Sequence, residues 1–154
     1  MFTILKNVKY LLFLLLFISI KAEAKNENLA LHGGYTFETS QEQRATAVYL
    51  SFFNNSEKQI EIESFSTDVA NSVEMHDIKI TDDIVKMFKV ENVEINSKSE
   101  LFLQPGGRHL MLFGLKKKLN DKESFVLKVH LKNKVVLETN ILVLDKKLKA
   151  NFLN

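Results

Sequence analysis

The stretch TAVYLSFFNNSEKQIEIESF, residues 46–65, decides the class of fold. In its first half Val48, Leu50 and Phe52 lie two residues apart, and side chains at that spacing on a strand share one face. The turn-forming residues 54–57 separate this half from a second run in which isoleucines alternate with glutamates. We therefore predict two β-strands, at residues 46–53 and 59–65, that pair as a hairpin.

Short alternating runs separated by turn residues continue along the chain, with no repeat and no long amphipathic helix pattern. This arrangement is typical of an all-β domain and predicts a two-sheet Greek-key sandwich or barrel of about eight strands. The lysine-rich stretch 116–118 and the tail 146–154 are predicted to be a solvated loop and a frayed terminus. The further predicted strands are residues 72–80, 84–90, 101–103, 108–113, 124–131 and 134–144.

The N-terminal residues have the pattern of a secretory signal. Lys6 and Lys9 precede the apolar run 11–20, and Ala22-Glu23-Ala24 follows it. The apolar run is too short to span a bilayer, which needs about 20 residues. We predict a signal peptide over residues 1–24 and one mature domain over residues 25–154, with no stable membrane insertion after cleavage. An uncleaved N-terminal anchor is the alternative, and both place the domain outside the cytoplasm.

Charge and cysteine content exclude several classes of function. Removing residues 1–24 leaves 18 basic and 18 acidic residues, a balance that gives no support for nucleic-acid binding. The chain has no cysteine. A disulfide framework, a thiolate zinc site, a cysteine nucleophile and a blue-copper centre, which needs a cysteine thiolate, are therefore excluded.

Histidine and methionine form the one pattern that suggests chemistry. His76, Met87, His109 and Met111 are spaced as H-x10-M-x21-H-x-M. His109 and Met111 are two apart on a predicted strand and must share a face. A turn centred on residues 81–82 would place His76 directly opposite Met87. Folding that brings the two His/Met pairs together would create a four-ligand metal site.

The ligand types select the metal. Thioethers are soft donors that suit Cu(I), and imidazole adds a stronger donor that tolerates either oxidation state of copper. Zinc, calcium and magnesium do not favour two thioethers. In an oxidising compartment methionines also avoid the disulfide that paired cysteines would tend to form. We therefore predict one Cu(I) ion as the bound metal.

The remaining histidines and methionine have plainer interpretations. Met75 shares a face with Val73 and is predicted to be core, with assistance to the metal as the alternative. His130 is predicted to face solvent, and His32 to be structural or an extra ligand. The whole His/Met pattern could also be a coincidence in an exported β-sandwich that binds no metal. No hydrolase motif is found, and we expect no enzyme activity.

Together with this motif, several stretches resemble the PCu(A)C family of periplasmic copper chaperones: residues 47–50 leading to Asn54-Asn55, residues 73–76, and LQPGGRHLMLFGL at 103–115. The resemblance implies a cupredoxin-like Greek-key β-barrel with the same four ligands. It also implies Cu(I) delivery to cytochrome c oxidase assembly, with the copper subunit of the oxidase or a Sco-type thiol protein as the recipient. A periplasmic copper storage or resistance role is the alternative.

The chain departs from the family at two places. Asp83 stands in a turn that often holds glycine, and the C-terminus lacks the His/Met-rich extension of some members. The second departure argues against a separate Cu(II) site.

Overall fold

The structure is a computed structural model that describes residues 28–82 and 84–152. The predicted signal peptide and Asp83 lie outside the described residues. Within the described part, no helix is long and apolar enough to cross a membrane. The strands are β1 (Leu29–Phe37), β2 (Ala45–Asn54), β3 (Ile60–Thr67), β4 (Ser72–Thr81), β5 (Ile84–Lys89), β6 (Val93–Ile95), β7 (Glu100–Phe102), β8 (His109–Phe113), β9 (Ser124–Leu131) and β10 (Val136–Leu144), followed by a 3-10 helix η1 (Lys146–Phe152).

Seven of these strands form a closed ring. The order of hydrogen-bonded neighbours is β4, β8, β2, β1, β10, β9 and β3, and β3 returns to β4 at Phe65 and Val73. The pair β1–β10 is parallel, and the other pairs around the ring are antiparallel. Closure removes the exposed edges that an open sheet would present. The predicted all-β barrel or sandwich is confirmed.

The predicted core faces also agree with the structure. Val48 and Phe52 on β2, and Leu127 and Val129 on β9, are fully buried inside the barrel. Burial of each such side chain contributes about 1.5–3 kcal/mol. Because a strand has a period of two, the residues between these core positions face outward, and on β2 and β8 these outward residues lead to the candidate site.

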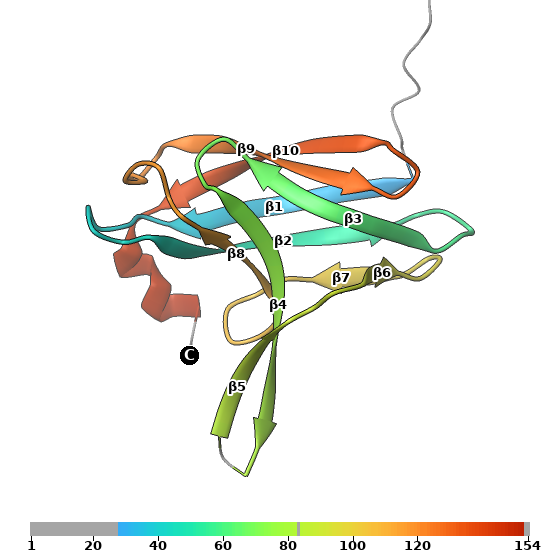
Figure 1. Ribbon diagram of the computed structural model, residues 1–154, viewed down its shortest axis with the longest axis horizontal. Coiled ribbons are helices and arrows are strands. Elements are labelled where there is room, and N and C mark those ends of the chain that lie inside the picture. The colour runs from blue at the N-terminus through green and yellow to red at the C-terminus, as the bar shows by residue number, and fades with distance from the viewer. Residues whose placement is uncertain (1–27, 83, 153–154) are drawn as a thin grey trace, which may run out of the picture.

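The second half of β4 and all of β5 extend away from the barrel as a hairpin, which we call the arm (residues 77–89; Figure 1). Every residue of β5 is exposed, and β5 pairs only with β4 among the described strands. The arm carries apolar side chains into solvent: Ile80, Ile84, Val85, Met87 and Phe88.

Two sequence predictions about the fold are wrong, and the set of predicted strands is incomplete. The runs at 46–53 and 59–65 do not pair with each other: β2 lies against β1, β7 and β8, and β3 against β4, β6 and β9. Strands β1 and β6 were not predicted. The tail predicted to be frayed begins with η1.

The failed hairpin has a physical cause in Asn54, the last residue of β2. Its side chain is 1 % exposed, and its Nδ2 group donates to the carbonyl oxygens of Lys58, Ile95 and Asn96. These bonds tie the end of β2 to the loop before β3 and to the end of β6. The chain therefore crosses to the other wall of the barrel before β3 begins.

Candidate metal centre

The two histidines of the motif are direct neighbours on adjacent strands. His76 on β4 lies opposite His109 on β8 in the antiparallel register. Their rings are nearly parallel, with an interplanar angle of 27° and centroids 6.2 Å apart. His109 is 9 % exposed, and the side chain of His76 is 11 % exposed. The fold thus brings together two largely buried imidazoles from positions 33 residues apart in the sequence.

The two methionines flank this pair on the same face. Met111 lies opposite Glu74, two positions along both strands from the His76–His109 pair and therefore on the same face. Met87 lies opposite Ile78, which shares the face of His76. Diagonal neighbours of this kind are within reach of long side chains. His76 therefore has a methionine diagonal to it on each neighbouring strand.

The predicted direct opposition of His76 and Met87 is wrong. His76 lies opposite Lys89. Thr81 pairs with Ile84, so the turn is centred one position later than predicted. Moving the turn by one residue changes the cross-strand partner of each residue by two positions. Because side chains alternate between faces with a period of two, the new partner lies on the same face as the predicted one. Met87 consequently stays on the side of His76, although it is 53 % exposed on the arm.

Hydrogen bonds orient both imidazoles. His109 Nδ1 donates to the carbonyl oxygen of Gly107 at 2.8 Å, which leaves Nε2 with its lone pair. His76 Nε2 lies 3.1 Å from Glu74 Oε2, whereas His76 Nδ1 is buried and has no hydrogen-bond partner. Buried polar atoms are normally paired, and an unpaired ring nitrogen is a free donor for a metal. The donor set, two imidazole nitrogens and two thioethers, fits Cu(I).

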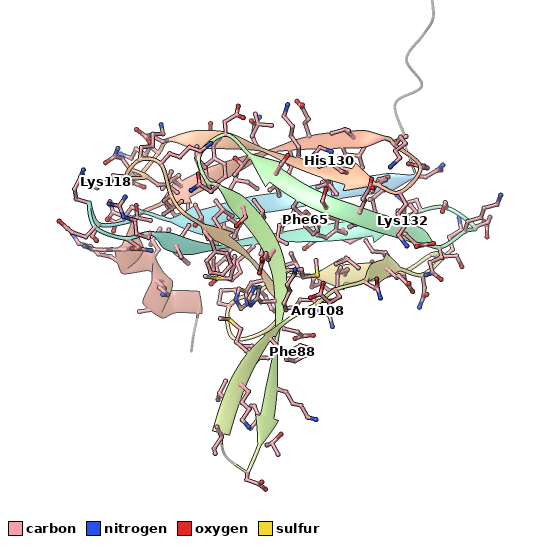
Figure 2. The ribbon with its side chains drawn as sticks, in the orientation of Figure 1. Phe65, Phe88, Arg108, Lys118, His130 and Lys132 are labelled. Atoms are coloured by element: carbon pink, nitrogen blue, oxygen red, sulfur yellow. The ribbon has the colours of Figure 1, made fainter. Side chains whose placement is uncertain are left out.

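An ion pair beneath the histidines holds the two strands in register. Arg108 precedes His109 and Asp77 follows His76, so both point to the opposite face. Arg108 Nε donates to Asp77 Oδ2 at 2.8 Å, and Nη2 donates to the same oxygen. Burial alone would raise the pKa of Asp77, but hydrogen bonds from Arg108 and the Ile78 backbone lower it below its ordinary value. Figure 2 shows Arg108 at the base of the arm, near Phe88, which is the cross-strand partner of Asp77.

Aromatic rings enclose the histidines on the barrel side. Phe113 lies 5.7 Å from the His76 ring and Tyr49 lies 6.4 Å from the His109 ring, between centroids. Burial, and then the proximity of Tyr35, raises the pKa of Tyr49. Tyr49 therefore remains a neutral phenol at physiological pH. These walls reduce contact with water and favour an ion of low charge.

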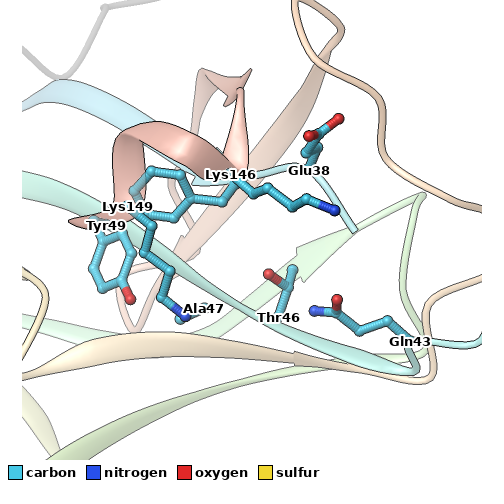
Figure 3. A pocket seen from close by; sticks show the side chains of 8 residues that line it. Glu38, Gln43, Thr46, Ala47, Tyr49, Lys146 and Lys149 are labelled. Atoms are coloured by element: carbon cyan, nitrogen blue, oxygen red, sulfur yellow. The ribbon is translucent and has the colours of Figure 1, made fainter. Parts of the chain in front are cut away.

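A hollow of about 330 Å³ borders the site beneath η1 (Figure 3). Tyr49 and Ala47 line it, Lys149 of η1 runs beside them, and Lys146 of η1 extends toward Glu38. Ala47 is the cross-strand partner of Met111, so the hollow adjoins the candidate ligands. It contains no histidine or methionine among its lining residues. The hollow therefore adjoins the candidate metal site and offers no histidine or methionine ligand of its own.

The other singled-out residues lie elsewhere. Met75 is 2 % exposed in the hydrophobic core, opposite Leu110, which confirms the prediction that it is core. The His32 ring packs against Phe53, farther along β2. His130 is half-buried and its Nε2 lies 2.8 Å from Ser66 Oγ, so it is not simply solvated as predicted.

Sequence reasoning missed Glu74 as part of the site. Its carboxylate contacts His76, and its backbone position faces Met111. The signal was present, because a residue two positions before His76 on the same strand must share its face. The described residues contain no cluster of three or more His, Cys, Asp or Glu side chains placed to hold a metal ion.

Comparison with known proteins gives a family and several similar structures. The model of the LpqE-like family matches residues 29–143. No curated protein matches the chain in sequence. Among solved structures, the copper-bound PCuAC domain from PmoF2 has a TM-score of 0.64 at 12 % identity and covers 77 % of this chain and 93 % of its own. The Cu(I) form of DR1885 from Deinococcus radiodurans has a TM-score of 0.59 at 25 % identity and covers 82 % of this chain and 85 % of its own.

Proposed function

Because this chain belongs to the LpqE-like family and has the fold of PCu(A)C domains, we propose that it is an exported copper(I) chaperone. It binds one Cu(I) through His76, Met87, His109 and Met111. The observation that supports this most is the direct cross-strand pairing of His76 with His109, flanked on the same face by both methionines. Copper is the cargo of the protein, and no catalytic step is assigned.

The chemistry of the four ligands suits binding followed by release. Thioethers are neutral, so they hold Cu(I) without strong charge neutralisation, and imidazoles complete the set. Glu74 and the Gly107 carbonyl oxygen fix the orientation of the two rings before the ion arrives. Such ordering in advance reduces the entropic cost of binding. The site is therefore suited to a reversible cargo.

The unequal exposure of the ligands suggests an order of release. Met87 is 53 % exposed on the arm, whereas His109 is 9 % exposed in the barrel wall. An incoming thiolate or imidazole of a recipient would displace Met87 first and take the ion by ligand exchange. The recipient we propose is the copper subunit of cytochrome c oxidase or a Sco-type thiol protein. Export follows from the signal pattern of residues 1–24.

Copper uptake by the mature protein tests this proposal. Under reducing conditions we expect binding to saturate at one equivalent of Cu(I), measured by competition with a chromophoric Cu(I) chelator. X-ray absorption of the loaded protein should show sulfur and imidazole scatterers together. Absence of uptake, or a bound ion without sulfur, would contradict the proposal. Transfer is checked by mixing the loaded protein with the metal-free oxidase subunit and measuring copper on each after separation.

A further inference from the structure

Glu74 lies among the candidate copper ligands without being one of them. It precedes His76 by two residues on β4 and lies opposite Met111 on β8. Its Oε2 is 3.1 Å from His76 Nε2, and its Oε1 is 4.0 Å from Nζ of Lys89. An ionised carboxylate accepts hydrogen bonds and cannot donate them. The proton of the neutral His76 ring must therefore lie on Nε2.

This arrangement accounts for the unpaired nitrogen on the same ring. With the proton on Nε2, His76 Nδ1 carries the lone pair, and this atom is buried without a hydrogen-bond partner. His109 has the reverse arrangement, because its Nδ1 donates to the Gly107 carbonyl oxygen and its Nε2 is left with the lone pair. The two facing rings thus have opposite tautomers, each selected by an acceptor-only oxygen.

We infer that Glu74 is a positioning residue that holds His76 as the Nε2–H tautomer and so presents Nδ1 to copper. The inference rests on the proposed function for the identity of the ion. A carboxylate hydrogen-bonded to a metal-binding imidazole fixes the ring and makes its free nitrogen more basic. Loss of such a partner typically reduces metal affinity 10- to 100-fold. Glu74 would therefore strengthen copper binding without touching the ion.

The tautomer is measured directly in the metal-free protein. Nitrogen-15 NMR of the imidazole side chains distinguishes a ring protonated on Nε2 from a ring protonated on Nδ1. We expect Nε2–H for His76 and Nδ1–H for His109 in the wild type. Glu74→Gln should weaken this preference, because its amide can either accept from Nε2–H or donate to an unprotonated Nε2, and Glu74→Ala should lose it. A protonated Nδ1 on His76 in the wild type overturns the inference.

Copper affinity provides the second measurement, by chelator competition with Cu(I). We expect Glu74→Ala to bind about 10- to 100-fold more weakly and Glu74→Gln to recover part of the loss. Glu138→Ala is the matched control, because Glu138 pairs with Lys128 at 3.2 Å on β10 and β9, away from the site. It should bind as the wild type does.

The outcomes separate this inference from the proposed function. A wild type that binds Cu(I), with Glu74→Ala binding equally well, overturns the inference and leaves the chaperone proposal standing. A wild type that takes up no Cu(I) overturns the chaperone proposal. It also overturns the part of the inference that says Glu74 strengthens copper binding. The NMR spectrum of the metal-free protein then still decides whether Glu74 selects the tautomer.

Discussion

Met111→Leu is expected to weaken Cu(I) binding by more than about 100-fold, because loss of a ligand costs more than the 10- to 100-fold loss seen for residues that only support ligands. Met111 lies on β8 between the core residues Leu110 and Leu112 but points to the opposite face, toward Glu74 and the histidine pair. Leucine nearly matches methionine in volume and lacks the sulfur. The substitution therefore removes the donor with little change in packing.

Met75→Leu is the matched control for this experiment. The same substitution is made one residue before His76, but in the core, where Met75 is 2 % exposed. A volume-conserving change of this kind usually costs less than about 1.5 kcal/mol of stability. Its Cu(I) affinity should equal that of the wild type in the same chelator competition. Equal affinities for Met111→Leu and Met75→Leu would show that Met111 is not a ligand.

Face assignments in the candidate site could be predicted from the sequence because the period of a strand is fixed. His109 and Met111 share a face on β8, as the spacing of two required. The register of the arm could not be predicted in the same way. Its loop has no glycine to mark the turn, and Asp82 adopts a positive φ of 51° that aspartate tolerates only at some cost. The predicted turn was therefore one residue early.

Strand order was less predictable than strand position, because it depends on contacts distant in sequence. Strand β1 was not predicted, because Gly33 and Gly34 interrupt its pattern of alternating side chains. The two glycines lie between His32 and Tyr35, where the register of the β1–β2 pairing shifts. Gly34 is required there, since a Cβ atom would lie 2.9 Å from the Asn140 carbonyl oxygen on β10. Two adjacent glycines suggest a turn in sequence. In the structure Gly33 has a positive φ of 69° at the irregular β1–β2 pairing, and Gly34 allows the close approach of β10.

Asn54→Ala is expected to lower the free energy of unfolding by about 3 kcal/mol. The side chain donates to three carbonyl oxygens, and its Oδ1 accepts from the backbone and hydroxyl of Ser56. Alanine would leave the carbonyl oxygen of Ile95 without this donor in a buried position, and each such loss costs about 1–3 kcal/mol. Urea unfolding monitored by circular dichroism should show a lower midpoint with an unchanged slope.

The neighbouring Asn55→Ala separates this role from a general effect of changing the loop. Asn55 is exposed. Its backbone N–H donates to the Asn28 carbonyl oxygen, its own carbonyl oxygen accepts from Lys98 Nζ, and alanine retains both of these backbone groups. Its free energy of unfolding should match that of the wild type within about 0.5 kcal/mol. Equal stability of the two variants would mean that Asn54 does not tie β2 to the end of β6. The crossing of the chain between the barrel walls would then depend on core packing alone, through side chains such as Phe52 and Ile95, which pack in the same buried cluster.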